Sequence, residues 1–222
     1  MNENMGAIFD ARIQHPFLMV VCGSTQSGKT CFVLNLLNNA DRLIHPPPEN
    51  VVWFYGEETT TTRHLESLNN DKIIPVKGIP SSFEAYISKD HNNLFIFDDL
   101  MEEVGHDKNM TRLFTRQSHH RNISVILITQ DLFYKGPERL TILRNAQYLV
   151  LFANPLDMSG TYAVASRIMP KKVPLFLNIF DVSTAPRHGY LFIDGKQNTP
   201  KEARFRTDIF KPYQKVYTIT SP

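Results

Sequence analysis

Residues 17–30 read FLMVVCGSTQSGKT, and the apolar residues of CFVLNLL follow at 31–37. A run of strand length is followed by two glycines, a lysine and a hydroxyl at the spacing G-x-x-x-x-G-K-[ST], and then by an apolar pattern that suits a helix. Glycine lets the backbone curl so that several N–H groups point into one hollow, and the next helix adds its positive N-terminal end. The stretch therefore predicts a phosphate-binding loop between a strand and a helix.

The residues of this loop have distinct expected roles in binding a nucleotide. Lys29 offers a point charge to the β- and γ-phosphates, and Thr30 offers a hydroxyl to Mg²⁺. The alternative is a chance match, which the flanking strand and helix make rarer than the motif alone. ATP and Mg²⁺ are the expected ligands, and the predicted cofactor-binding residues are Gly23, Ser24, Thr25, Gln26, Ser27, Gly28, Lys29 and Thr30.

Two adjacent acids follow another apolar run, LFIFDDL at 94–100. Asp98, at the carboxyl end of a buried strand, is predicted to hold Mg²⁺ by accepting a hydrogen bond from a metal-bound water or from Thr30. Asp99 would then point toward the γ-phosphate and orient or deprotonate the attacking water. The alternative is that the two acids only end a strand and begin a turn.

The run SVILITQ at 124–130 ends in an amide, Gln130, that is predicted to contact the γ-phosphate or the attacking water. An extra strand between the strand of the phosphate loop and the strand of the metal-binding acid distinguishes RecA-like and AAA-type ATPases from kinases and GTPases. The alternative is that Gln130 is simply a polar residue at the end of a strand.

The remaining pattern predicts an α/β fold, a P-loop NTPase of the RecA-like (ASCE) type with a mostly parallel central sheet flanked by helices. Strands are expected at 17–23, 50–56, 94–99, 124–130 and 148–152. Helices are expected at 29–39, 81–89, 110–120, 139–146 and 160–169, the second with Ser81 and Glu84 as a capping box. Strands near 188–195 and 203–210 would form a small antiparallel C-terminal addition.

Length and composition narrow the possibilities further. We expect one P-loop ATPase domain over 1–222, with a core at about 15–152 and a C-terminal extension at about 153–215. The sequence has no run of 18 apolar residues and no secretory signal pattern, so neither a membrane span nor secretion is expected. Two cysteines do not make a disulfide framework, and a net charge of +2 does not by itself indicate nucleic acid.

With these motifs in order, the sequence resembles the FtsK–HerA superfamily, and within it the small genome-packaging ATPases of poxviruses, virophages and Polinton- or adintovirus-type elements. The resemblance extends from about residue 15 to 210. The phrase LRNAQYLVLF, followed by Pro155 and Asp157, is its most specific part. It rests on residues 15–30, 94–100, 116–133, 143–152 and 204–210.

The resemblance implies a homo-oligomeric ring, a hexamer or a pentamer, that hydrolyses ATP and pumps double-stranded DNA into a preformed capsid. Its partners would be double-stranded DNA and capsid or portal-like vertex proteins. It would act in the host cytoplasm or nucleus, at the site where virions assemble, and association with the virion is left open. In such rings an arginine acts on the neighbour's γ-phosphate; Arg121 is the first candidate here, before Arg116 and Arg144. Each is otherwise a solvated surface arginine. Many members carry glutamate where this chain has Asp99.

Three other functions remain open on the sequence alone. A nucleotide kinase also begins with a phosphate loop, but the strand ending in Gln130 would then lack a purpose. A GTP-dependent switch needs an N-K-x-D base-reading motif, and the sequence contains none. A helicase, export or conjugation motor would share the ATPase machinery without packaging a genome. Basic segments at 110–145 and 167–206 are compatible with any DNA motor.

Overall fold

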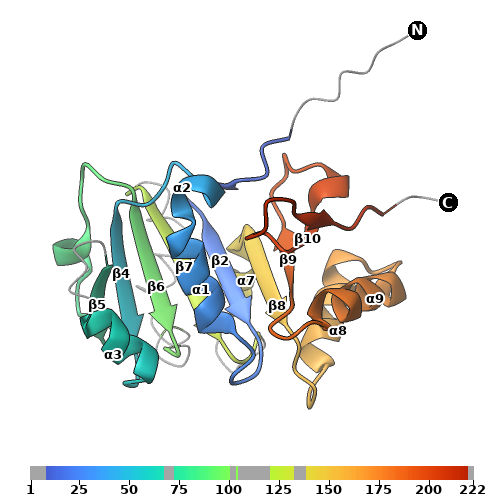
Figure 1. Ribbon diagram of the computed structural model, residues 1–222, viewed down its shortest axis with the longest axis horizontal. Helices are drawn as coiled ribbons and strands as arrows, with labels where there is room; N and C mark the ends of the chain where they lie inside the picture. The colour runs from blue at the N-terminus through green and yellow to red at the C-terminus, as the bar shows by residue number, and fades with distance from the viewer. Residues whose placement is uncertain (1–8, 68–72, 101–103, 105–120, 133–138, 220–222) are drawn as a thin grey trace, which may run out of the picture.

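The chain folds around a nine-stranded sheet (Figure 1). Its strand order is β11-β10-β9-β8-β2-β7-β6-β4-β5. The structure is a computed structural model, and it describes residues 9–67, 73–100, 104, 121–132 and 139–219. Each statement below about the fold concerns these residues.

Six neighbouring strands of the sheet are parallel, and all five strands predicted for the core are among them. They are β2 (Leu18–Cys22), β4 (Asn50–Tyr55), β5 (Ile73–Lys77), β6 (Asn93–Asp98), β7 (Ile123–Thr129) and β8 (Tyr148–Phe152). Strand β7 lies between β2 and β6, which confirms the predicted extra strand between the phosphate loop and the acids. Because parallel strands point the same way, the ends of β2, β6 and β7 meet at one edge of the sheet.

The C-terminal part of the sheet is antiparallel, as predicted. Strand β9 (Tyr190–Asp194) pairs with the free side of β8, β10 (Phe205–Thr207) pairs with β9, and β11 (Lys215–Val216) pairs with β10. Every residue of β9 and β10 is buried. The addition therefore continues the sheet beyond β8, which would otherwise be an exposed edge strand.

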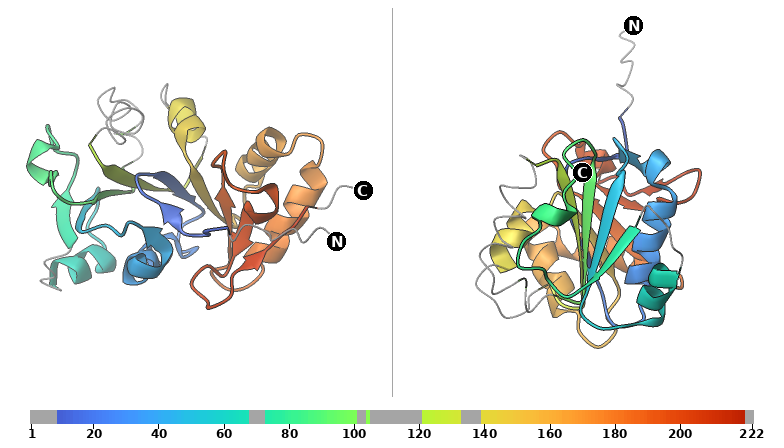
Figure 2. Two further views of the ribbon diagram at one scale, coloured as in Figure 1. Left: turned by 90° about the horizontal axis from the view of Figure 1, so that it is seen from above. Right: turned by 90° about the vertical axis from the view of Figure 1, so that its left-hand side faces the viewer.

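Helices cover both faces of the sheet (Figure 2). On one face lie α1 (Lys29–Asn38), α2 (Ala40–Leu43) and α3 (Thr60–Ser67). On the other face lie α7 (Arg139–Asn145), α8 (Ser159–Ile168) and α9 (Val173–Thr184). Each face has its own apolar core, and the strands are buried from both sides, which explains their nearly unbroken apolar sequences. A separate pair of parallel strands joins β1 (Ile13–Gln14) to β3 (Ile44–His45).

The prediction of a helix over 81–89 was wrong. The structure has only a short 3-10 helix at Glu84–Tyr86, and Ser82, not Ser81, accepts a hydrogen bond from the Glu84 backbone N–H. The rings of Phe83 and Tyr86 pack edge-on against Phe54. These two aromatic residues are three apart, as in a helix, but they pack on the sheet from an irregular segment. A second 3-10 helix, Lys201–Ala203, precedes β10.

Two further predictions have different outcomes. Helices at 139–146 and 160–169 are confirmed as α7 and α8, whereas the helix predicted at 110–120 lies outside the described residues. Strand β5 was not predicted, because its sequence IIPVK is short, contains a proline and is only partly buried. None of the described helices has both the length and the apolar character needed to cross a membrane.

Candidate active site

The predicted phosphate loop, residues 23–30, connects β2 to α1 and is curled by two residues with positive φ. Gly28 has a φ of 110° and Gln26 a φ of 62°. Gly23 is required for packing, since a Cβ there would lie 2.5 Å from the Cβ of Phe152. The Gly23 N–H donates to the carbonyl of Thr129, which ties the start of the loop to the end of β7.

Lys29 and Thr30 begin α1, and both line a pocket at this edge of the sheet. The Lys29 ammonium donates to the carbonyl oxygens of Gly23 and Ser24, each at 2.8 Å. Burial lowers the pKa of Lys29, while the negative charges of Asp98 and Asp99 act in the opposite direction. The two hydrogen bonds therefore keep the Lys29 side-chain nitrogen inside the loop, where phosphate oxygens could replace the carbonyl oxygens.

Asp98 ends β6 and faces the loop across the same pocket. Burial, reinforced by the neighbouring charge of Asp99, raises the pKa of Asp98 from 3.8 to about 6. The Trp53 indole N–H and the charge of Lys29 lower this pKa in part. The Trp53 N–H still makes no hydrogen bond of ordinary geometry to any described residue, so we regard its effect as a weak dipolar one. The surroundings of Asp98 therefore stabilise its ionised form less than water would.

Asp99 and Gln130 extend the site toward solvent. Asp99 is exposed and has a φ of 56°, a conformation that aspartate adopts more readily than most residues. The Gln130 amide lies between the loop and this acid: its Oε1 accepts from the Thr25 hydroxyl at 3.0 Å, and its Nε2 donates to Asp99 Oδ1 at 3.5 Å. The end of β7 therefore links the phosphate loop to the second acid.

The pocket that these residues share has a volume of about 230 Å³. Besides the predicted residues, it is lined by Tyr55, Glu57 and Thr59, which follow or end β4. Sequence reasoning missed this wall, although the carboxyl end of β4 reaches the same edge as that of β6. Glu57 is exposed and lines the same pocket as Asp98 and Asp99, so it offers a second carboxylate base for activating water.

The donors present fit Mg²⁺ bound together with phosphates. A hydroxyl, Thr30, and an under-compensated carboxylate, Asp98, line one pocket, and both are oxygen ligands suited to this ion. Within the described part of the chain, no group of three or more His, Cys, Asp or Glu side chains could hold a metal without other ligands. Such a sparse set suits a metal that completes its shell with substrate oxygens and water.

The candidate arginines lie elsewhere. Arg121 precedes β7 and pairs with Glu84, so it sits at the opposite edge of the sheet, more than about 20 Å from Gln130 along the strand. Arg144 is exposed near the end of α7, just before the amino end of β8, and Arg116 lies outside the described residues. None of the described candidates reaches its own pocket, so a role at a neighbouring subunit stays a prediction.

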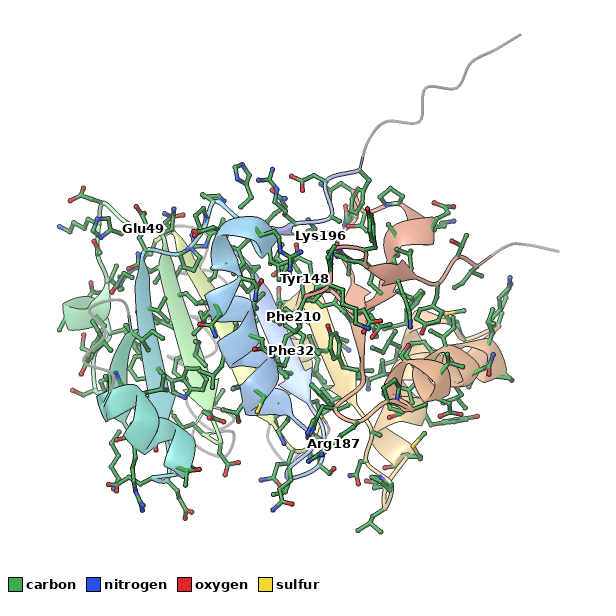
Figure 3. The ribbon with its side chains drawn as sticks, viewed as in Figure 1. Phe32, Glu49, Tyr148, Arg187, Lys196 and Phe210 are labelled. Carbon is green, nitrogen blue, oxygen red and sulfur yellow. The ribbon has the colours of Figure 1, made fainter. Side chains whose placement is uncertain are left out.

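Two residues beside the loop were not singled out as site residues by sequence. Arg187 and His188, in the turn between α9 and β9, line a pocket together with residues 24–27. Arg187 is labelled in Figure 3. No local motif marks them, since their neighbours in space are about 160 residues away in sequence.

Comparison with known proteins supports the fold. The sequence matches no protein-family model and no curated protein. Solved structures of the genome-packaging NTPase B204 from Sulfolobus turreted icosahedral viruses are similar. The DNA-packaging ATPase B204 of Sulfolobus Turreted Icosahedral Virus has a TM-score of 0.60 at 10% identity, covering 93% of this chain and 100% of that one. B204 from Sulfolobus turreted icosahedral virus 2, in complex with ATP-gammaS, has a TM-score of 0.58 at 13% identity, covering 91% and 97%.

The same viral protein in complex with AMP gives a TM-score of 0.54 at 13% identity, covering 89% of this chain and 98% of that one. In these three comparisons the likeness covers between 89% and 93% of this chain. The structural resemblance to viral packaging ATPases, first indicated by the sequence motifs, therefore holds over nearly the whole fold.

Proposed function

We propose that the chain is an ATP-driven translocase of double-stranded DNA that packages a viral or virus-like genome. The observation that carries this proposal is the pocket in which Lys29 and Thr30 face Asp98, with Gln130 directly after the strand between them. In a nucleotide kinase we would expect the strand of the acids beside that of the loop. Here β7 separates them, which favours an ATPase.

In this proposal the residues of the pocket divide the work of hydrolysis. The Thr30 hydroxyl and the Asp98 carboxylate would hold Mg²⁺, which when bound neutralises charge on the phosphate oxygens. Lys29 would exchange the carbonyl oxygens of Gly23 and Ser24 for the β- and γ-phosphates. Asp99 would accept a proton from the attacking water.

Gln130 would position that water and report the terminal phosphate to the loop. Its Oε1 is already held by Thr25, and its Nε2 lies at the edge of hydrogen-bonding distance from Asp99. A change at the γ-phosphate would therefore alter contacts of both the loop and the acid. This arrangement supports Gln130 as a sensor.

The work done by hydrolysis is proposed from the likeness to B204 and from the sequence resemblance. We propose a homo-oligomeric ring that moves duplex DNA into a capsid, with capsid or vertex proteins as partners, at the site of virion assembly in the host. Arg121 would act on the neighbouring subunit's nucleotide, which requires its exposed ion pair with Glu84 to open. Such a pair contributes little stability, so opening it costs little.

The test is the rate of ATP hydrolysis with and without duplex DNA, together with the native mass. We expect Mg²⁺-dependent turnover that DNA stimulates, an oligomer in solution, and no turnover in Lys29→Ala. Phosphate transfer to a nucleoside monophosphate, without stimulation by DNA, would instead identify a kinase. Copurification with capsid proteins would separate packaging from export or helicase motors.

A further inference from the structure

A second pocket lies against the phosphate loop, apart from the pocket that holds the acids. It has a volume of about 280 Å³, and residues 24–27 form one of its walls. The opposite wall comes from the end of β8 and from the turn between α9 and β9. That wall consists of Phe152, Ala153, Pro155, Thr184, Arg187, His188 and Gly189.

The turn that builds this wall is fixed to the loop. His188 Nδ1 lies 3.1 Å from the Ser27 carbonyl oxygen; since a carbonyl only accepts, His188 donates from Nδ1. His188 packs so closely that a Cβ on Gly28 would lie 2.9 Å from its ring. Gly189 is equally constrained, because a Cβ there would lie 2.6 Å from the Ser183 carbonyl oxygen. The wall is therefore a preformed surface of the site.

Arg187 is the cation of this wall. Its side chain is exposed, and no described residue forms an ion pair or a hydrogen bond with it. Figure 3 shows Arg187 beside the tip of the loop that precedes α1. An unpaired guanidinium on a pocket wall can stack on a flat ring or bind an anion.

We propose that this second pocket receives the nucleoside end of the nucleotide, with the Arg187 guanidinium stacked on the face of the base. This inference rests on the proposed nucleotide-binding function. If the loop holds the phosphates and the terminal phosphate faces Asp98 in the first pocket, the nucleoside must leave the loop on another side. The two pockets share Thr25 and Gln26, so one extended ligand can occupy both.

The chemistry of the wall favours recognition of the base by its face. No carboxylate or side-chain amide, two of the kinds of group that read the edges of bases, is among the described residues opposite the loop. The Thr184 hydroxyl donates to the Phe180 carbonyl at 2.9 Å, so it keeps only acceptor capacity. Stacking tolerates any base, because every base has a π-face. ATP and GTP should therefore bind with similar affinity.

The experiment is titration calorimetry of ATP, GTP and inorganic tripolyphosphate, each with Mg²⁺, against the wild type, four variants at Arg187 and Lys89, and Lys29→Ala. Arg187→Ala removes both charge and plane, Arg187→Lys keeps the charge, and Arg187→Tyr keeps a plane. The matched control is Lys89→Ala, since Lys89 is exposed near the amino end of β6, away from the loop. Circular dichroism of each variant checks that it is folded.

We expect Arg187→Ala to weaken the affinity for ATP and GTP about 10-fold, which is the effect of losing one stacking partner. The affinity for tripolyphosphate should stay within about twofold of the wild-type value. Arg187→Tyr should restore most of the nucleotide affinity and Arg187→Lys should not. If Arg187→Ala weakened tripolyphosphate binding as much as nucleotide binding, or if only Arg187→Lys restored nucleotide affinity, Arg187 would be a phosphate contact and the proposal would be overturned. So would unchanged nucleotide affinity in Arg187→Ala, or a clear preference for ATP over GTP in the wild type.

Failure of the underlying function would look different. If the wild type bound neither nucleotide nor tripolyphosphate, or if Lys29→Ala bound them as well as the wild type, nucleotide binding at the loop itself would be wrong. Loss confined to Lys29→Ala would leave the function standing and remove only the role of Arg187.

Discussion

Asp98→Asn should make the protein more stable while it abolishes hydrolysis. The folded structure raises the pKa of Asp98 from 3.8 to about 6, mainly by burial. A difference of this size corresponds to about 3 kcal/mol of unfavourable free energy for the ionised side chain. Asparagine fills the same volume without the charge, so it removes this cost.

The pH dependence gives the prediction its sign. Below about pH 4 Asp98 is protonated in both the folded and the unfolded state, so it does not lower the free energy of unfolding. Between pH 4 and 6 the unfolded chain ionises first, so the wild type loses stability as pH rises. Above pH 6 both states are ionised and the full cost remains. The advantage of Asp98→Asn should therefore be about 3 kcal/mol at pH 8 and about half of that at pH 5.

Urea unfolding of both proteins at pH 5 and pH 8, without Mg²⁺ or nucleotide, measures this difference. For a chain of this length, 3 kcal/mol corresponds to a rise in Tm of about 6–12 °C. Asp99→Asn is the control: Asp99 is exposed, and asparagine tolerates its positive φ, so only the smaller charge effect of Asp99 on Asp98 should be relieved. An Asp98→Asn protein no more stable than wild type at pH 8, or equally stabilised at both pH values, would refute the reasoning.

Three further predictions concern the site and the C-terminal addition. Gln130→Ala should lower kcat about 100-fold and change the Kd of ATP little, measured by steady-state turnover and calorimetry; a change in Kd alone would contradict its role as a sensor. Arg121→Ala should abolish turnover, keep nucleotide binding and poison wild-type subunits on mixing; full activity would exclude Arg121 as the residue acting in trans. Arg206→Ala should destabilise the protein by about 3–5 kcal/mol in urea unfolding, because it leaves Asp194 buried without its partner at 3.1 Å; a loss below about 1 kcal/mol would show that water compensates the charge.

The sequence predicted the parallel core well because its strands are buried on both faces. Continuous apolar runs such as LMVVC and ISVILIT leave few other options. It failed where burial and local conformation point in different directions. Phe83 and Tyr86 have helix-like spacing, but they pack on the sheet from irregular backbone. Strand β5 gains its partners from β4, a long-range pairing that a five-residue sequence with a proline does not reveal.

The candidate site divides along the same line. Asp98 and Gln130 lie where a strand ends or just beyond it, and Lys29 begins the helix that follows the phosphate loop. Local sequence was therefore enough to single them out as site residues. Glu57 could have been found by the same rule, since it follows the end of β4. Arg187 and His188 could not, because their place beside the loop depends on how α9 and β9 pack, and no motif accompanies them.

The C-terminal addition is structurally part of the site. Phe32 of α1 packs edge-on against Tyr190 of β9 and against Phe210, with ring centroids 4.8 and 5.1 Å apart (Figure 3). The loop that precedes α1 is held on one side by Gln130, through Thr25, and on the other by His188. Close-packed contacts do not stretch, so a loop that shifts when the terminal phosphate leaves must also shift Gln130 or the turn at His188. The first route leads to the acids and the second to α9. In the proposed motor, the first would time hydrolysis and the second would carry its effect out of the site.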